Sequence, residues 1–170
     1  MAKALLISTE DITKKTAVNG NVDVNLFVQF VEIAQDVHIQ NYLGTDLLQA
    51  CQTLITAGEL GDAGNEAYET LVETWVKPCL IHWAMVEYLP FAAYTIANKG
   101  VYKHSSENSD NVEKNEVDFL IEKERQIAQH YTERFIDYIC FNNDLFPEYT
   151  QNSNGDMYPD TKNNYTGWYL

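Results

Sequence analysis

Apolar residues recur at three- and four-residue steps along most of the chain, which is the spacing of helices with one buried face. The clearest stripe lies between Asp23 and Gly44 and consists of Leu26, Phe27, Phe30, Val31, Ala34, Val37, His38 and Tyr42. Asp23 is a candidate N-cap, and Gly44 is expected to end this helix in the left-handed conformation. Thr45 is expected to cap the next helix, which the glycine-rich turn at Gly58 ends.

Two longer helices are expected, one from residue 64 or 65 to about 98, and one that starts near residues 109–112 and ends at 142–143. The first contains Pro78 and Pro90, and each proline removes one backbone donor and clashes with the preceding turn. We therefore expect a break or kink just before Pro78 and a weaker distortion near Pro90. Residues 102–111 are polar and rich in Ser and Asn, which predicts a surface loop or a short hairpin.

The start of the chain carries a helix signal of its own. Ser8 and Asp11 stand three residues apart, as in a capping box, so a short helix is expected to run from there to about Lys15. Residues 4–8 look extended, and strand signals are otherwise almost absent. The pattern predicts an all-α fold: a bundle of four to five helices with one Pro-broken long helix, an extended N-terminal segment and an extended aromatic C-terminal arm.

The C-terminal arm, residues 144–170, follows the predicted helical domain of residues 1–143. Its rings are spaced by Asn, Asp, Gly, Pro and Thr without any period, and they are Phe146, Tyr149, Tyr158, Tyr165, Trp168 and Tyr169. Disordered tails are usually poor in aromatic residues, so these rings are expected to be buried. The arm either folds back on its own domain or docks, at least in part, on a neighbouring subunit or partner. We favour docking, with the arm's six rings and with Tyr102 and His104 of the polar loop as candidate contacts.

Charge and cysteine content narrow the class of protein. Asp and Glu outnumber Lys and Arg by 25 to 11, giving a formal net charge of −14, which suits a wall past which DNA slides better than a DNA-binding surface. Cys51, Cys79 and Cys140 lack metal-binding spacing and are interpreted as free buried thiols. Residues 79–97 are apolar almost all round but contain His82 and Glu87, which favours a central helix over a membrane span.

Chemical motifs are missing from the sequence. There is no phosphate-binding loop, nucleophile elbow, zinc-protease motif or Glu-x-x-His pair for a di-iron bundle. His82 and Glu87 are five residues apart and do not share a helix face. Glu124 interrupts the last apolar stripe, and we expect it to pair with a Lys or Arg at the edge of that stripe. No catalytic, metal-binding or cofactor-binding residue is predicted, and the chain is not expected to be an enzyme.

Two segments carry a resemblance to a known family. Residues 25–48, NLFVQFVEIAQDVHIQNYLGTDLL, pair an amphipathic helix with a Tyr-Leu-Gly stop and a following helix. Residues 75–100, WVKPCLIHWAMVEYLPFAAYTIANKG, form a Pro-broken apolar helix followed by Asn-Lys-Gly and a polar loop. Together with the opening LISTEDITKK, they resemble head–tail connector proteins of tailed bacteriophages, nearest to those of crAss-like and other Bacteroidetes phages.

The resemblance implies a virion protein, made in the bacterial cytoplasm, that forms a homo-oligomeric ring of typically twelve subunits beneath the portal. Such a ring extends the channel through which genomic DNA passes without sequence-specific binding, and it joins the portal to tail or stopper proteins. Residues 101–111 would correspond to the family's variable loop, and no catalytic residue carries over. The alternative is a small acidic helical interaction or inhibitor protein that binds a basic partner through its charge.

Overall fold

The computed structural model describes residues 3–16, 24–92, 94–97, 100–103, 114–151, 153 and 155–161. The α-helices are α1 (Thr9–Lys15), α2 (Val24–Ala34), α3 (Gln40–Ala57), α4 (Glu66–Thr70), α5 (Lys77–Tyr88), α6 (Lys114–Phe141) and α7 (Pro147–Gln151). Two π-helical segments, η1 (Gln35–Ile39) and η2 (Leu71–Val76), and two short 3-10 turns, η3 (Leu89–Phe91) and η4 (Asn143–Leu145), extend or connect them. The predicted all-α bundle is confirmed, with one small β-hairpin added.

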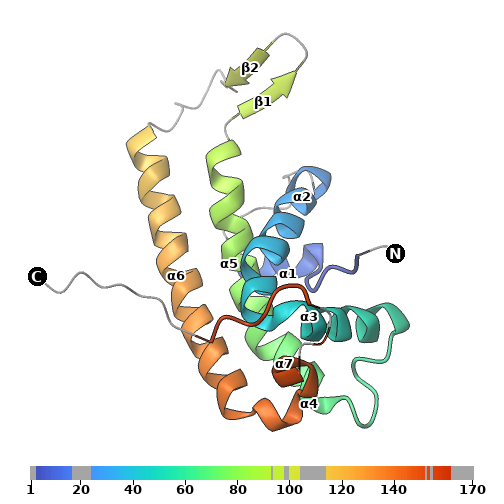
Figure 1. Cartoon of the computed structure of the whole chain (residues 1–170). Helices are drawn as coiled ribbons and strands as arrows, with labels where there is room; N and C mark the ends of the chain where they lie inside the picture. Colours follow the sequence, from blue (N-terminus) through green and yellow to red (C-terminus); the bar gives the residue numbers. More distant parts are fainter. Residues whose placement is uncertain are drawn as a thin grey trace, which may run out of the picture.

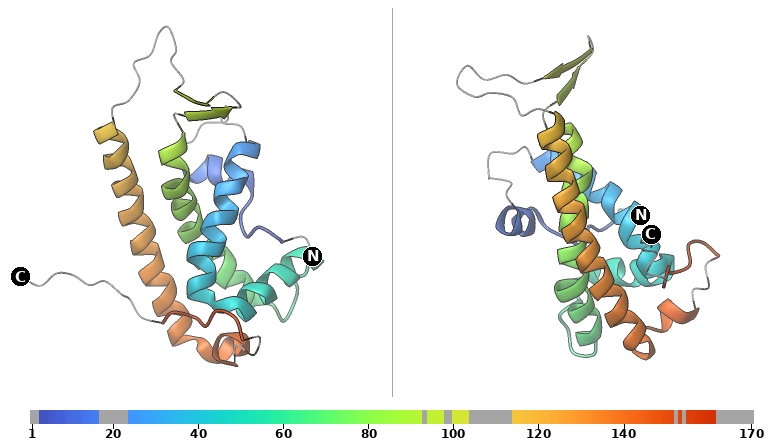
Figure 2. Two further views of the ribbon diagram at one scale, coloured as in Figure 1. Left: turned by 45° about the horizontal axis from the view of Figure 1, so that its top comes forward. Right: turned by 90° about the vertical axis from the view of Figure 1, so that its left-hand side faces the viewer.

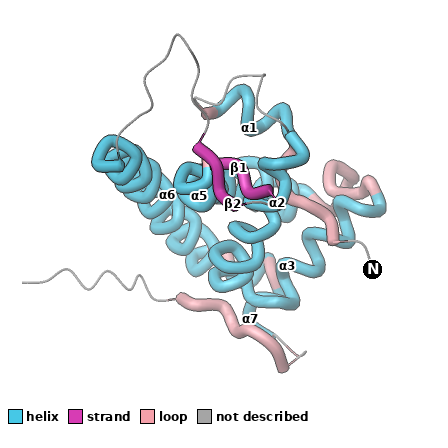
Figure 3. Tube along the Cα trace, turned by 90° about the horizontal axis from the view of Figure 1, so that it is seen from above, coloured by secondary structure: helices cyan, strands magenta, loops and turns pink. Residues whose placement is uncertain are grey.

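Helix α5 lies between α2 and α6, and these three helices form one layer (Figures 1 and 3). Helix α3 crosses the lower end of that layer in Figure 1. Cys79, Leu80, Ile81 and Ala84 of α5 are all completely buried. The all-round apolarity of this segment is therefore that of a central helix surrounded by other helices. Within the described residues, no helix has the length and apolarity needed to cross a membrane.

The distortion expected before Pro78 takes the form of a π-helical segment. Helix α4 continues through η2 into α5, and the N–H of Lys77 donates to the carbonyl of Val72, five residues back. Pro78 follows within the first turn of α5, where its missing N–H and fixed φ are best tolerated. The widened turn thus lets one long helical column contain a proline without ending there.

The helix ends earlier than the predicted residue 98. Helix α5 stops at Tyr88, and the 3-10 turn at Leu89–Phe91 contains Pro90. Residues Tyr94–Ala97 then form strand β1, which pairs antiparallel with β2 (Gly100–Lys103). Proline cannot continue the ladder of helix hydrogen bonds, and the β-branched residues after it favour a strand. The hairpin projects beyond the ends of α5 and α6 (Figure 2).

The predicted capping box at the N-terminus is present. The Asp11 N–H donates to the Ser8 hydroxyl, and the Ser8 N–H donates to the Asp11 carboxylate. The extended segment before it is fixed by Gln35, a fully buried side chain of η1. The Gln35 side-chain oxygen accepts from the Leu6 N–H at 3.0 Å, and its amide nitrogen donates to the Ala4 carbonyl at 3.1 Å. Leu6 is thereby held inside the core.

Two helices meet at a bend at Gly44 within α3, so the helix ends there as predicted, with a positive φ but with an extended ψ instead of the left-handed conformation. The Gly44 φ of 74° and ψ of 164° lie in a region that only glycine occupies at low cost. A Cβ atom added to Gly44 would lie 2.8 Å from Cδ of Pro159. This close approach is possible because the C-terminal segment, of which residues 153 and 155–161 are described, crosses the bend at that point.

The C-terminal segment is held at the bend by a set of hydrogen bonds that we call the clasp, formed by Gln40, Asn41, Thr45 and Asp46 with Ser153, Asp156, Met157 and Asp160. The Thr45 N–H donates to the Met157 carbonyl at 3.0 Å, and the Met157 N–H donates back to the Thr45 hydroxyl at 3.2 Å. The same hydroxyl donates to Asp156 at 2.9 Å and accepts from the Gln40 amide at 3.0 Å. One threonine side chain therefore uses all its hydrogen-bonding capacity there.

The remaining contacts of the clasp lie on either side of Thr45. The buried Asp46 carboxylate accepts from both the backbone N–H and the hydroxyl of Ser153. The Asp160 N–H donates to the Asn41 carbonyl at 2.8 Å. The clasp thus joins both halves of the bent helix to a segment more than 100 residues later in the chain.

Replacing Gly44 by Ala is expected to lower the free energy of unfolding by roughly 3 kcal/mol, because the new methyl group meets Pro159 in a backbone conformation unfavourable to alanine. Gly58→Ala is the control: its φ is also 74°, but nothing lies within 4 Å of the added Cβ, so the expected loss is about 1 kcal/mol. Urea unfolding measures both. Pro159→Ala should recover part of the Gly44→Ala loss, and equal losses at the two glycines would contradict the steric account.

Candidate functional site

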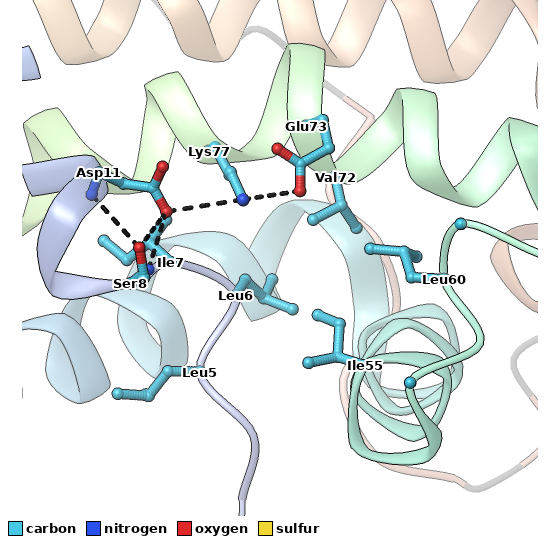
Figure 4. Close-up of a pocket in the computed structure, with 12 residues that line it drawn as sticks. Leu5, Leu6, Ile7, Ser8, Asp11, Ile55, Leu60, Val72, Glu73 and Lys77 are labelled. Atoms are coloured by element: carbon cyan, nitrogen blue, oxygen red, sulfur yellow. Dashed lines mark hydrogen bonds and ion pairs between the residues drawn. The ribbon is translucent and has the colours of Figure 1, made fainter. Parts of the chain in front are cut away.

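A cavity of about 410 Å³ opens between the N-terminal segment, the end of α3 and the junction of η2 with α5 (Figure 4). We call it the N-terminal pocket. Its lining combines apolar and charged side chains with two glycines: Leu5, Leu6, Ile7, Ser8, Asp11, Ile55, Gly58, Leu60, Gly61, Val72, Glu73 and Lys77. The volume is within the range of pockets that bind small molecules or single large side chains.

One side of the N-terminal pocket carries a paired charge system. The Lys77 ammonium lies 2.6 Å from a Glu73 carboxylate oxygen and 3.5 Å from an Asp11 carboxylate oxygen (Figure 4). Glu73 and Lys77 are four residues apart, so the π-to-α junction places them on one face. Only 15% of the Lys77 side chain is exposed, and its charge is matched within the protein.

The Asp11 carboxylate is stabilised in its ionised form. Burial disfavours that charge, but hydrogen bonds from the Ser8 N–H and hydroxyl, together with the Lys77 ammonium, outweigh burial and lower the Asp11 pKa. The lining of the pocket thus combines the carboxylates of Asp11 and Glu73 with the ammonium of Lys77. The Lys77 ammonium, held between two carboxylates, is poorly suited to act as a nucleophile.

Two histidine–carboxylate pairs join α5 to its neighbours. His82 Nδ1 lies 2.7 Å from Glu124 of α6, and His38 Nε2 of η1 lies 2.9 Å from Glu87. The expectation that Glu124 pairs with a Lys or Arg is wrong, because the rotation of α6 against α5 brings a histidine opposite it instead. His82 and Glu87 have separate partners, as expected from their different helix faces.

The His38 ring also stacks on the Trp83 indole, with ring centroids 3.9 Å apart. Burial lowers the His38 pKa, and Arg125 lowers it further, while the Glu87 carboxylate acts in the opposite direction. The Trp83 indole N–H donates to the Thr132 hydroxyl at 3.0 Å, and Thr132 in turn donates to a backbone carbonyl of α6. These polar groups are satisfied by one another and tie η1, α5 and α6 together.

Two of the three cysteine thiols are buried and unreactive. Burial raises the pKa of both Cys51 and Cys79 to about 12, so both remain protonated at neutral pH. Cys140 was expected to be buried as well, but it is exposed at the end of α6. Across the described ranges, no three His, Cys, Asp or Glu side chains gather in a group that could hold a metal ion.

The candidate contact residues of the arm divide into two groups. Phe146 is 0% exposed and packs edge-on against Tyr68, and Tyr149 is also buried in the core. Their assignment to a partner interface is corrected: η4 and α7 turn the arm back under α3, as in the alternative in which it folds on its own domain. Tyr158 is 67% exposed and remains available to a partner.

The structure gives less information on the remaining predicted contact residues. Tyr102 belongs to β2, opposite Thr95 of β1. His104, Tyr165, Trp168 and Tyr169 lie outside the described residues. The candidates that the structure describes are therefore not gathered into one site.

Sequence reasoning missed the N-terminal pocket and the clasp. Their parts come from segments far apart in the chain, so no local spacing reveals them. The available signals were weak: Glu73 and Lys77 form an i, i+4 pair just before an apolar helix, and Thr45 follows a glycine. Both are also typical of ordinary solvent-exposed helices and helix caps.

The chain belongs to a protein family of unknown function, DUF6712, whose model matches residues 39–159. No curated protein and no solved structure matches the chain. The matched region begins just before the bend at Gly44 and ends at Pro159, so it includes the contact between these two residues. The family's extent therefore fits a domain that is closed by its C-terminal segment.

Phe146→Ala is expected to lower the free energy of unfolding by about 3–5 kcal/mol, since it removes a fully buried ring from the core. Tyr158→Ala is the matched control in the same arm, and its effect should stay within about 0.5 kcal/mol because its ring is exposed. Chemical denaturation followed by circular dichroism measures both. A small effect of Phe146→Ala would place that ring outside the core.

The His38 pKa gives the stability a pH dependence. Because burial lowers this pKa in the folded state, the unfolded chain binds the proton at higher pH, and stability falls as the pH decreases through about 6.5. His38→Gln should therefore show a shallower loss of stability between pH 7.5 and 5 than the wild type. His130→Gln, at an exposed position of α6, is the control for the loss of a histidine outside the core. Urea titrations across this range measure the slopes, and a steeper slope for His38→Gln would contradict the prediction.

Proposed function

We propose that the protein is a head–tail connector subunit: a virion structural protein that forms a ring beneath the portal and joins the capsid to the tail. The proposal starts from the resemblance of residues 25–48 and 75–100 to that family. The geometry adds two supporting observations and the composition a third, and the projecting hairpin carries the most weight.

The β1–β2 hairpin stands clear of the helical body (Figure 2). It follows the 3-10 turn η3 at the end of α5 and includes the first part of the segment that the resemblance equates with a variable loop. A two-stranded hairpin alone is only marginally stable in water, and its outer edges present unpaired backbone groups. Such a hairpin is suited to insertion between neighbouring subunits or into the adjoining ring, where its edges and faces become covered.

The helical layer exposes apolar side chains on both of its outer members. Helix α6 exposes Phe119 (60%) and Leu120 (47%), and α2 with η1 exposes Ile33 and Val37 (56%). These helices lie on opposite sides of α5 (Figure 3). Two different apolar faces on opposite sides suit a head-to-tail contact, which closes into a ring when the rotation between copies allows it.

The negative net charge of the chain suits a ring through which DNA passes. With only 11 Lys and Arg residues and a net charge of −14, a ring of these subunits would offer phosphate few attachment points. DNA could then slide through the lumen without being retained.

Co-expression with the portal protein of the same genome tests the proposal. Negative-stain electron microscopy of the purified complex is expected to show rings stacked on the portal, with a copy number near twelve. Leu120→Glu should reduce ring formation strongly by placing a charge in the apolar contact. Leu145→Glu, which changes another exposed leucine in η4, beyond the opposite end of α6, should assemble normally. Absence of rings for the wild type with the portal present would overturn the proposal.

The charge also supports a second candidate, an acidic interaction or inhibitor protein that binds a basic partner. Such binding would weaken steeply as salt is added, because it depends on opposite charges that the salt screens. A pull-down from host extract at low and high salt discriminates: a single basic partner lost at high salt favours this candidate over the connector.

A further inference from the structure

We propose that the N-terminal pocket is a docking site for residues 162–170 of a second copy of this chain. The segment reads KNNYTGWYL and follows directly on the clasp. The inference deepens the proposed function, on which it rests for the closed ring, but the contact itself can be tested without the portal.

The pocket's chemistry fits aromatic side chains. Leu6, Ile55 and Leu60 point toward one another there from three different parts of the chain (Figure 4). The only cation in its lining, Lys77, is already matched by Asp11 and Glu73. The pocket therefore offers apolar surface to rings and carboxylate oxygens to hydroxyl or indole N–H donors. About half of the Glu73 side chain is exposed, so it remains accessible as an acceptor.

The charge of the pocket lining also favours residues 162–170 as its occupant. Two carboxylates and one ammonium leave the pocket with an excess negative charge, which disfavours most segments of a chain whose net charge is −14. Residues 162–170 are an exception, since they contain Lys162 and no acidic residue. They also carry Tyr165, Trp168 and Tyr169, which can fill an apolar pocket and donate hydrogen bonds at the same time.

The direction of the chain selects a second copy rather than the same one. The clasp fixes Pro159 over Gly44 and Asp160 on Asn41. Along residues 155–161 the chain runs toward α6 and away from the N-terminal segment that lines the pocket (Figures 1 and 3). At Thr161 the chain is thus directed away from the pocket, which suits a head-to-tail contact. Nine extended residues span up to about 30 Å, enough to cross an interface.

A peptide experiment tests the pocket. The acceptor is the full-length variant Tyr165→Ala/Trp168→Ala/Tyr169→Ala, whose own segment cannot compete, and the probe is fluorescently labelled KNNYTGWYL. Fluorescence anisotropy is expected to show saturable binding. Adding Leu60→Glu should weaken it at least tenfold, whereas the matched Leu145→Glu should leave it unchanged. Circular dichroism checks that each variant is folded. No saturable binding up to about 1 mM, or equal binding by the Leu60→Glu acceptor, overturns the inference.

A mixing experiment tests whether the contact is between copies. Full-length Leu60→Glu keeps its segment but lacks a working pocket, and the triple alanine variant keeps its pocket but lacks the rings. Sedimentation velocity of each variant alone should show monomers. Their 1:1 mixture should contain heterodimers that do not grow further, because only one contact can form. A mixture that stays monomeric although the peptide binds would place the segment in its own pocket and overturn the contact between copies.

The two proposals fail differently. Peptide binding and heterodimers without rings on the portal would refute the connector function alone. Rings that form equally well with Leu60→Glu would refute the pocket contact alone.

Discussion

The fold depends on how the bend at Gly44 is satisfied. A bend inside a helix interrupts its hydrogen-bond ladder and leaves backbone groups without partners, each costing about 1–3 kcal/mol if buried. Here the C-terminal segment supplies those partners: Met157 accepts from the Thr45 N–H, and Asp160 donates to the Asn41 carbonyl. The bend is therefore both a defect in α3 and the place where the C-terminal segment attaches. Glycine is needed because Pro159 occupies the space of a side chain.

The clasp also explains why the first part of the arm belongs to the domain. Between α6 and the clasp, η4 and α7 carry Phe146 and Tyr149 into the core. The Tyr68 hydroxyl donates to Glu148 of α7 at 2.8 Å, a further link between the arm and α4. The chain is therefore attached to the domain at two places, at the core by Phe146 and Tyr149 and at the bend by Met157 and Asp160. Its direction at the bend is thereby set by the folded domain, and this is what makes a directed contact with a neighbour possible.

Local features of the structure could be predicted from the sequence, and long-range ones could not. The capping box at Ser8 and the apolar stripes of α2 and α6 follow from spacings of three and four residues. Proline at 78 predicts a distortion, but whether it becomes a break or a π-turn depends on the packing around it. The His82–Glu124 pair depends on how two helices are rotated against each other. The N-terminal pocket forms where three segments that are far apart in the chain meet, and the sequence of any one segment does not predict that meeting.

The charge of the chain constrains how copies can associate. Subunits that each carry −14 repel one another, so a contact between copies must rely on apolar and aromatic surface and must avoid adding carboxylates. The exposed Leu120 on α6 and the aromatic, acid-free residues 162–170 both meet this requirement. Added salt screens the repulsion between copies, whereas it weakens attraction to a basic partner. Ionic strength thus acts in opposite directions on the two candidate functions, because one brings like charges together and the other brings opposite charges together.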